Sequence, residues 1–146
     1  MAEDSRVAGG DVYLPVDEAE WWGSALAVLV AAIHHPQLLT DAHPRPEDVA
    51  RQVLAGLSRL RSAATCAGEG REGNDIEVSR SASVRCEGDE IAFSPGSEVA
   101  NLAWCLEIFA KAVLEPDGRS ATIARGATGY AASAWSRDIG KASGAL

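Results

Sequence analysis

The chain has 146 residues and a formal net charge of −8, from 21 acidic and 13 basic residues. Its length is that of one domain, and 47% hydrophobic with 23% charged residues is ordinary globular composition rather than that of a disordered chain. The acidic balance argues against direct nucleic-acid binding, because phosphates are neutralised by an excess of Lys and Arg on the binding face.

The first predicted helix begins at Asp17, which has the capping-box spacing to Glu20. Its body, residues 21–33, is apolar on nearly every side, which is typical of a helix buried in a core or shared with a partner. The helix is expected to end in the run His34, His35 and Pro36. We interpret Trp21 and Trp22 as core residues, with an aromatic anchor at an interface as the alternative.

A second helix is predicted from Pro46, a favoured first helical position, to the glycine-rich stretch near Gly68. Its apolar residues recur with a period of 3.6, which indicates an amphipathic surface helix.

From Ile76 the period changes to 2, which indicates a half-buried strand whose even-numbered residues point inward. Arg80 is the one charged residue on that inward face, where Cys86 is also expected. The turn at Glu87, Gly88 and Asp89 then leads into a second strand at residues 90–93, with Ile91 and Phe93 inward, and so predicts a hairpin.

A third helix is predicted with Ser94 as its cap and Pro95 at its first position, and it ends at residues 115–118. Beyond it, residues 119–146 are rich in Ala, Gly and Ser and carry a net charge of +3. Glycines interrupt this stretch, so we expect a basic tail with at most a short helix around Trp135.

The order helix, helix, hairpin, helix predicts an α+β fold, in which three main helices pack on one face of a small antiparallel sheet. Residues 1–118 are expected to form a single domain, followed by the tail at 119–146. The edges of so small a sheet must be covered or paired, so we also expect a homodimer, through an edge strand or the apolar first helix.

No cofactor or metal site is expected. Residues 68–73 match the string G-x-G-x-x-G, but they follow a helix, precede a strand and include two glutamates, so a plain loop is the better interpretation. His34 and His35 are adjacent and diverge by about 100° on a helix, which prevents easy sharing of an ion. Cationic groups are favourable at a helix C-terminus without any metal.

Three widely spaced cysteines, at positions 66, 86 and 105, favour a reducing cytoplasm over a disulfide framework. Residues 1–10 lack the apolar core of a secretory signal, and the longest apolar run, residues 25–33, falls short of the ~20 residues of a membrane span. Eleven of the 13 basic residues are arginine, a usage that suggests a GC-rich bacterial or phage gene.

The negative charge is concentrated in residues 1–20 and 62–98, each of which sums to −5. No catalytic motif accompanies it. Small acidic bacterial proteins of this kind are often immunity proteins, antitoxins or phage inhibitors, so we predict a non-catalytic protein that neutralises a basic partner protein. The expected binding residues lie on the loop and outer face of the hairpin: Glu69, Glu72, Asp75, Glu77, Glu87, Asp89 and Glu90.

Two alternatives remain open. One is a small-ligand protein or small enzyme with a pocket between sheet and helices, formed by Arg80 with His34 or His35. The other is a subunit of a larger complex, with Trp21, Trp22 and Trp104 as contacts.

Overall fold

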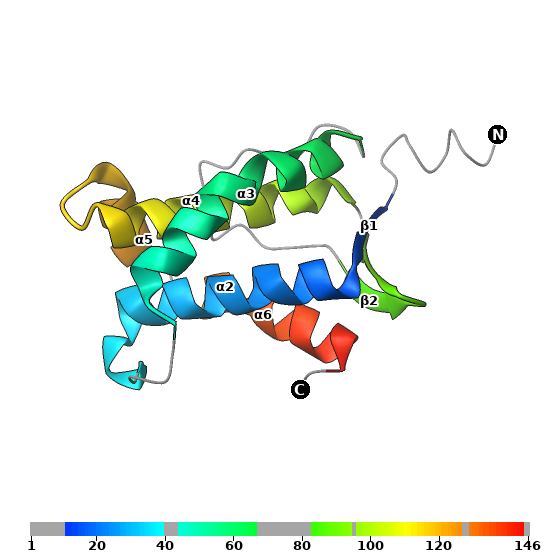
Figure 1. Ribbon diagram of the computed structural model, residues 1–146, viewed down its shortest axis with the longest axis horizontal. Helices are drawn as coiled ribbons and strands as arrows, with labels where there is room; N and C mark the ends of the chain where they lie inside the picture. Colours follow the sequence, from blue (N-terminus) through cyan, green and yellow to red (C-terminus); the bar gives the residue numbers. More distant parts are fainter. Residues whose placement is uncertain (1–10, 40–43, 67–82, 95, 127–128, 145–146) are drawn as a thin grey trace.

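The computed structural model describes residues 11–39, 44–66, 83–94, 96–126 and 129–144. Two short 3-10 segments, Pro36–Leu38 and Gly96–Glu98, accompany the main elements. The strands and α-helices, in chain order, are β1 (Val12–Pro15), α2 (Val16–His34), α3 (Pro46–Cys66), β2 (Ser83–Glu87), β3 (Glu90–Ser94), α4 (Val99–Leu114), α5 (Arg119–Gly126) and α6 (Gly129–Ser143). The predicted α+β class is confirmed, with the small sheet at one end of the helices (Figure 1).

The sheet has three antiparallel strands in the order β1-β3-β2. Strand β1 was not predicted, because four residues are too few to show an alternating pattern. The inner face of the sheet contributes Val12, Leu14, Ile91 and Phe93 to the core, all of them buried. Glu87 and Glu90 on the outer face are exposed, as the prediction of one apolar and one polar face requires. Ala92 is the exception, since it lies on the outer face and is fully buried.

The predicted hairpin is present, and Glu87 and Glu90 pair across its two-residue turn. Gly88 at the first turn position has φ of 65°, as a type II′ turn requires. Cys86 is exposed, which contradicts its expected burial, because β2 is an edge strand and Cys86 lies at its end, beside the turn. Ile76 and Arg80, on the earlier part of the expected strand, lie outside the described residues.

Helix α2 begins one residue before the predicted start, directly after Pro15 and without any side-chain capping bond. The predicted capping box of Asp17 and Glu20 is therefore wrong. The Val16 N–H instead donates to the carbonyl oxygen of Asp89 at 3.0 Å. This bond extends the β1–β3 ladder by one step, so strand pairing satisfies the first amide of the helix.

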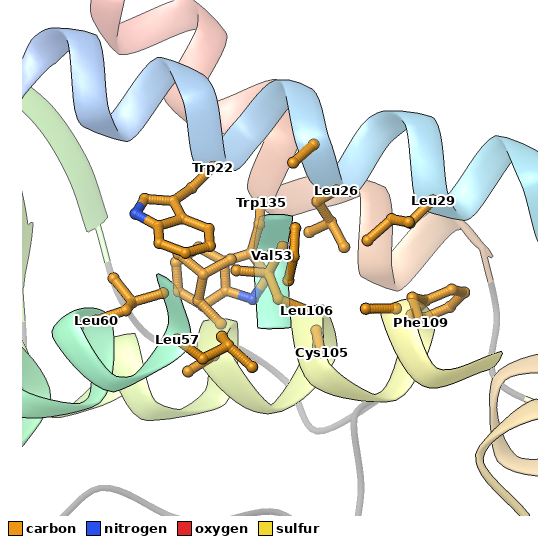
Figure 2. Close-up of a cluster of buried hydrophobic side chains, with 14 of the residues drawn as sticks. Trp22, Leu26, Leu29, Val53, Leu57, Leu60, Cys105, Leu106, Phe109 and Trp135 are labelled. Atoms are coloured by element: carbon orange, nitrogen blue, oxygen red, sulfur yellow. The ribbon is translucent and has the colours of Figure 1, made fainter. Parts of the chain in front are cut away.

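The core lies between α2, α3, α4 and α6 (Figure 2). Trp22, Leu26 and Leu29 of α2 point toward the apolar stripe of α3 and toward α4. A Cβ at Gly56 would come within 3.2 Å of the Trp22 indole, so glycine at this position lets α3 pack close to it. The two adjacent tryptophans differ: Trp22 is 3% exposed and belongs to the core, whereas Trp21 is 38% exposed.

Helix α4 begins at Val99, and Ser94 ends β3 rather than capping the helix. The predicted cap is therefore wrong, because the Ser94 hydroxyl is used within the sheet, where it accepts a hydrogen bond from Arg85 at 2.8 Å. Pro95 lies outside the described residues. The core-facing stripe of α4 is formed by Val99, Leu102, Leu106 and Phe109, which are fully buried.

The final stretch of the chain contains two helices, α5 and α6, where at most one short helix was expected. Helix α6 has 15 residues and packs along α2 and against β2. Trp135 and Ile139 are 2% and 1% exposed, and the Trp135 ring lies 6.1 Å from that of Phe93. These side chains complete the core beneath the sheet, despite the glycines around them.

Candidate acidic surface

Three of the predicted binding residues lie together around the β2–β3 turn. Glu87, Asp89 and Glu90 are all exposed, with Glu87 and Glu90 facing each other across the last strand pair. The three carboxylates belong to four consecutive residues, 87–90, which form the tight turn at Gly88. The other four predicted residues, Glu69, Glu72, Asp75 and Glu77, lie outside the described part of the chain.

The start of α2 lies beside this turn. The bond from the Val16 N–H to the Asp89 carbonyl places Asp17, which is exposed, at the same end of the molecule. Pro15, Val16, Asp17, Gly88 and Asp89 line an open surface cavity of about 450 Å³. Asp17 and Asp89, which belong to the two acidic stretches of the sequence and are 72 positions apart, therefore meet at one surface. Asp17, Glu87, Asp89 and Glu90 are called the acidic surface below.

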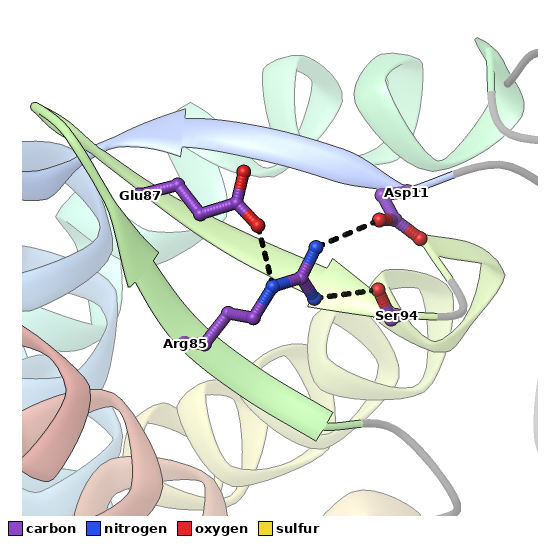
Figure 3. Close-up of polar contacts among 4 residues, drawn as sticks. All are labelled: Asp11, Arg85, Glu87 and Ser94. Atoms are coloured by element: carbon purple, nitrogen blue, oxygen red, sulfur yellow. Dashed lines mark hydrogen bonds and ion pairs between the residues drawn. The ribbon is translucent and has the colours of Figure 1, made fainter.

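Arg85 is a counter-charge bonded directly to Glu87, one of these carboxylates (Figure 3). It extends across the outer face of the sheet, and its Nη2 donates to Asp11 at 3.1 Å. Its Nε donates to Glu87 at 2.5 Å and its Nη1 to Ser94 at 2.8 Å. Hydrogen bonds to Asp11 and Glu87 raise the pKa of Arg85 above its ordinary value. The guanidinium links β2 and β3 to the residue that precedes β1, and it neutralises part of the charge of Glu87. The charges of Asp89 and Glu90 add to the surface.

Glu18 and Glu107 are acids with a structural role instead. Glu18 pairs with Arg59 of α3 at 2.9 Å and lies 3.4 Å from the Trp22 Nε1. Glu107 pairs with Arg61 of α3 and with Lys111 at 2.8 Å. Burial raises the pKa of Glu107, but the hydrogen bonds from Lys111 and Arg61 outweigh it, and the net pKa is lowered. Both carboxylates therefore bind α3 to its neighbouring helices.

The alternative ligand pocket is not assembled by the described residues. Arg80 lies outside them, and His34 and His35 lie at the opposite end of α2 from the hairpin, about 28 Å away along a helix of 19 residues. The His34 ring is 5.9 Å from that of Phe109, and its buried Nε2 has no hydrogen-bond partner. His35 is exposed, and its backbone N–H closes the helix by donating to Ala31 at 2.8 Å.

The tryptophans expected as contacts in a larger complex are divided by the fold. Trp21 is exposed, Trp22 is buried and Trp104 is half-buried, with no partner for its buried Nε1. Among these three tryptophans, only Trp21 is therefore exposed enough to contact a partner.

Within the described ranges, no group of three or more His, Cys, Asp or Glu side chains is arranged to hold a metal ion. No helix in the same ranges has the length and apolar character needed to cross a membrane.

Sequence reasoning missed Asp17 as a member of the acidic surface and assigned it to a helix cap. The available signal was the charge of −5 in residues 1–20, but nothing in the sequence placed those residues beside the hairpin. Compared with known proteins, the chain matches no family model, no curated protein and no solved structure.

Proposed function

We propose that this protein is a non-catalytic binding protein that uses the acidic surface to neutralise a basic partner protein, as immunity proteins, antitoxins and phage inhibitors do. The observation that carries the proposal is the β1–β3 pairing, which brings Asp17 to the hairpin acids Glu87, Asp89 and Glu90. Carboxylates gathered on one surface attract a cationic partner and raise its association rate by one or more orders of magnitude at low salt.

The surface also has the rigidity that recognition requires. A backbone bond joins the turn to the first turn of α2, and Arg85 bonds the Glu87 carboxylate and Asp11, so the backbone that carries the acidic surface is held in place before binding. Preorganised groups lose less conformational entropy when a partner binds. We further propose a bacterial, cytoplasmic setting, in keeping with the arginine usage and the three widely spaced cysteines.

The test is affinity capture from a lysate of the encoding organism, at low salt and at about 0.5 M salt, where charges are screened within a few ångströms. The variant Asp17→Asn/Asp89→Asn/Glu90→Gln removes three exposed carboxylates from the acidic surface. The control variant Glu47→Gln/Glu115→Gln/Asp117→Asn removes three exposed carboxylates elsewhere.

We expect the unaltered protein and the control to capture the same basic protein at low salt and to retain much less of it at high salt. The acidic-surface variant should capture at least about tenfold less, a loss of ~1.4 kcal/mol. Equal capture by both variants, or a captured protein without a basic surface, would refute the proposed function.

A further inference from the structure

A second surface feature is the open edge of the sheet. The strand order β1-β3-β2 leaves β1 and β2 as the two edges. Strand β1 ends in Pro15, whose nitrogen carries no hydrogen, and α3 packs against this strand. Proline on an edge strand hinders the addition of another strand. Strand β2 contains no proline, and among the described residues no strand lies on its side away from β3 (Figure 3).

The pairing register identifies the backbone groups at the edge of β2. The Val16 N–H donates to the carbonyl oxygen of Asp89, so the odd-numbered residues from 89 to 93 face β1 and the even-numbered residues of β3 face β2. Residues 83, 85 and 87 pair with these even-numbered residues. Because backbone groups alternate in direction along a strand, the N–H and C=O groups of Val84 and Cys86 point away from β3. Among the described residues, no backbone group outside the sheet bonds to either of them.

The surroundings of β2 leave this edge accessible. Cys86 is exposed and Val84 is half-buried. Helix α6 packs against β2, and its Trp135 lies against Phe93 of the inner face, so α6 supports the strand from beneath the sheet. The outward groups of Val84 and Cys86 can therefore pair with one further extended strand through up to about four backbone hydrogen bonds.

The charge beside this edge favours a cationic occupant. Arg85 bonds to Asp11 and Glu87 on the outer face, and the exposed carboxylates of Asp89 and Glu90 follow at the turn. These residues carry four carboxylates and one guanidinium, so the edge has an excess of negative charge. A second copy of the chain would bring the same excess to the interface, whereas a strand with lysine or arginine near the turn would be attracted.

We propose that β2 receives an extended, cationic segment of the basic partner protein as a fourth strand of the sheet; this rests on the proposed function and specifies the element of the partner. The added strand runs antiparallel to β2, as every neighbouring pair in the sheet does. Its inward side chains lie beside Val84 and Cys86 and are apolar. Its outward side chains are cationic where they lie beside Glu87 and the turn, and uncharged beside Arg85.

The experiment uses two synthetic peptides of about seven residues, in which valine alternates with lysine in the first half and with threonine in the second half. The second peptide has the same sequence but is N-methylated at two consecutive central residues. It keeps the charge and the side chains and loses a hydrogen-bond donor on each of its edges. Binding to the full chain is measured at low salt by calorimetry, and the exchange rates of the Val84 and Cys86 amide protons are measured by nuclear magnetic resonance.

Two substitutions separate the backbone of β2 from its side chains. Cys86→Pro removes an outward N–H group from an exposed position, and Cys86→Ala changes the same side chain but keeps the N–H group. We expect the unmodified peptide to bind about tenfold more tightly than the N-methylated one, and Cys86→Pro to remove most of that difference. Cys86→Ala should leave the difference unchanged. Near saturation, the unmodified peptide should slow the exchange of both amide protons about tenfold.

Equal affinity of the two peptides, or unchanged exchange at Val84 and Cys86 when the unmodified peptide is bound, would overturn the edge proposal. Both measurements use the unaltered protein, so they decide the matter even if Cys86→Pro fails to fold. Equal effects of Cys86→Pro and Cys86→Ala, in variants that fold, would also overturn it.

The outcomes separate this proposal from the proposed function. If both peptides bind equally and the acidic-surface variant weakens both, the edge proposal is wrong and the proposed function is supported. If neither peptide binds, the edge proposal is overturned, and affinity capture alone decides the proposed function. A mass of twice 15.2 kDa without peptide, reduced to 15.2 kDa by Cys86→Pro but not by Cys86→Ala, would show that a second copy of the chain occupies the edge instead.

Discussion

Replacing Trp135 tests whether α6 is an integral part of the core. Trp135 is 2% exposed and lies against Phe93 of the central strand, so Trp135→Ala leaves a cavity between α6 and the sheet. Substitutions of buried tryptophan by alanine cost ~3–5 kcal/mol, and the lost aromatic pair accounts for ~0.5–1.5 kcal/mol within such a cost. For a chain of this length, the midpoint of thermal unfolding should fall by about 10 °C or more.

The assay is urea unfolding followed by far-ultraviolet circular dichroism, and the matched control is Trp21→Ala. Trp21 is 38% exposed, so its replacement removes less buried area and should cost at most ~2 kcal/mol. The same substitution is thus compared at a core site and at a surface site. If Trp135→Ala destabilises the protein no more than Trp21→Ala does, α6 is not part of the cooperative core and our account of the fold is wrong.

Two further substitutions test the hairpin turn and the contact between α3 and α4. Gly88→Ala introduces a Cβ with no atom within 4 Å but at φ of 65°, and it should cost ~1–2 kcal/mol in urea unfolding. Gly126→Ala, equally open and without a positive φ, should cost nothing; equal effects would contradict the assigned turn. The pKa of Glu107 is lowered in the folded state. Its ion pairs therefore stabilise the protein at pH values above the pKa of Glu107 in the unfolded state, and this stabilisation is lost as the pH falls through its pKa in the folded state. The Glu107→Gln variant should therefore be less stable than the unaltered protein at pH ~7, by less than ~1 kcal/mol because both cationic partners are partly exposed. At pH ~2 the two proteins should be equally stable. The same difference in stability at both pH values would refute this role of Glu107.

The longer amphipathic elements could be predicted because their own residues determine them. The apolar stripes of α3 and α4 repeat over several turns, and their helical period is a local property of the sequence. The hairpin was recognised in the same way, from Gly88 at its turn and alternation on either side. Where such local signals agree with the tertiary structure, prediction from a single sequence succeeds.

The errors arose where a distant partner decides the local structure. Asp17 and Glu20 have the spacing of a capping box, but the Asp89 carbonyl satisfies the first helical amide, so the helix starts earlier. Ser94 has the chemistry of a helix cap, but its hydroxyl accepts from Arg85 across the sheet. Helix α6 contains glycines that lower its intrinsic propensity, yet burial of Trp135 and Ile139 outweighs that cost.

The same dependence on distant partners explains why the acidic surface was only half predicted. The charge of −5 in each of two segments is visible in the sequence, but their meeting depends on the four-residue strand β1, which has no recognisable pattern. Pairing of β1 with β3 makes one surface from Asp17 and the hairpin acids, whereas Glu18, one residue further on, turns toward Arg59 of α3 and is neutralised. Net charge therefore overstates what a partner meets, because an acid attracts a cationic protein only where its own fold leaves the carboxylate unpaired and exposed. By that criterion we expect Asp17, Asp89 and Glu90 to contribute most to binding at the acidic surface, and Glu87 to contribute less because of its bond to Arg85.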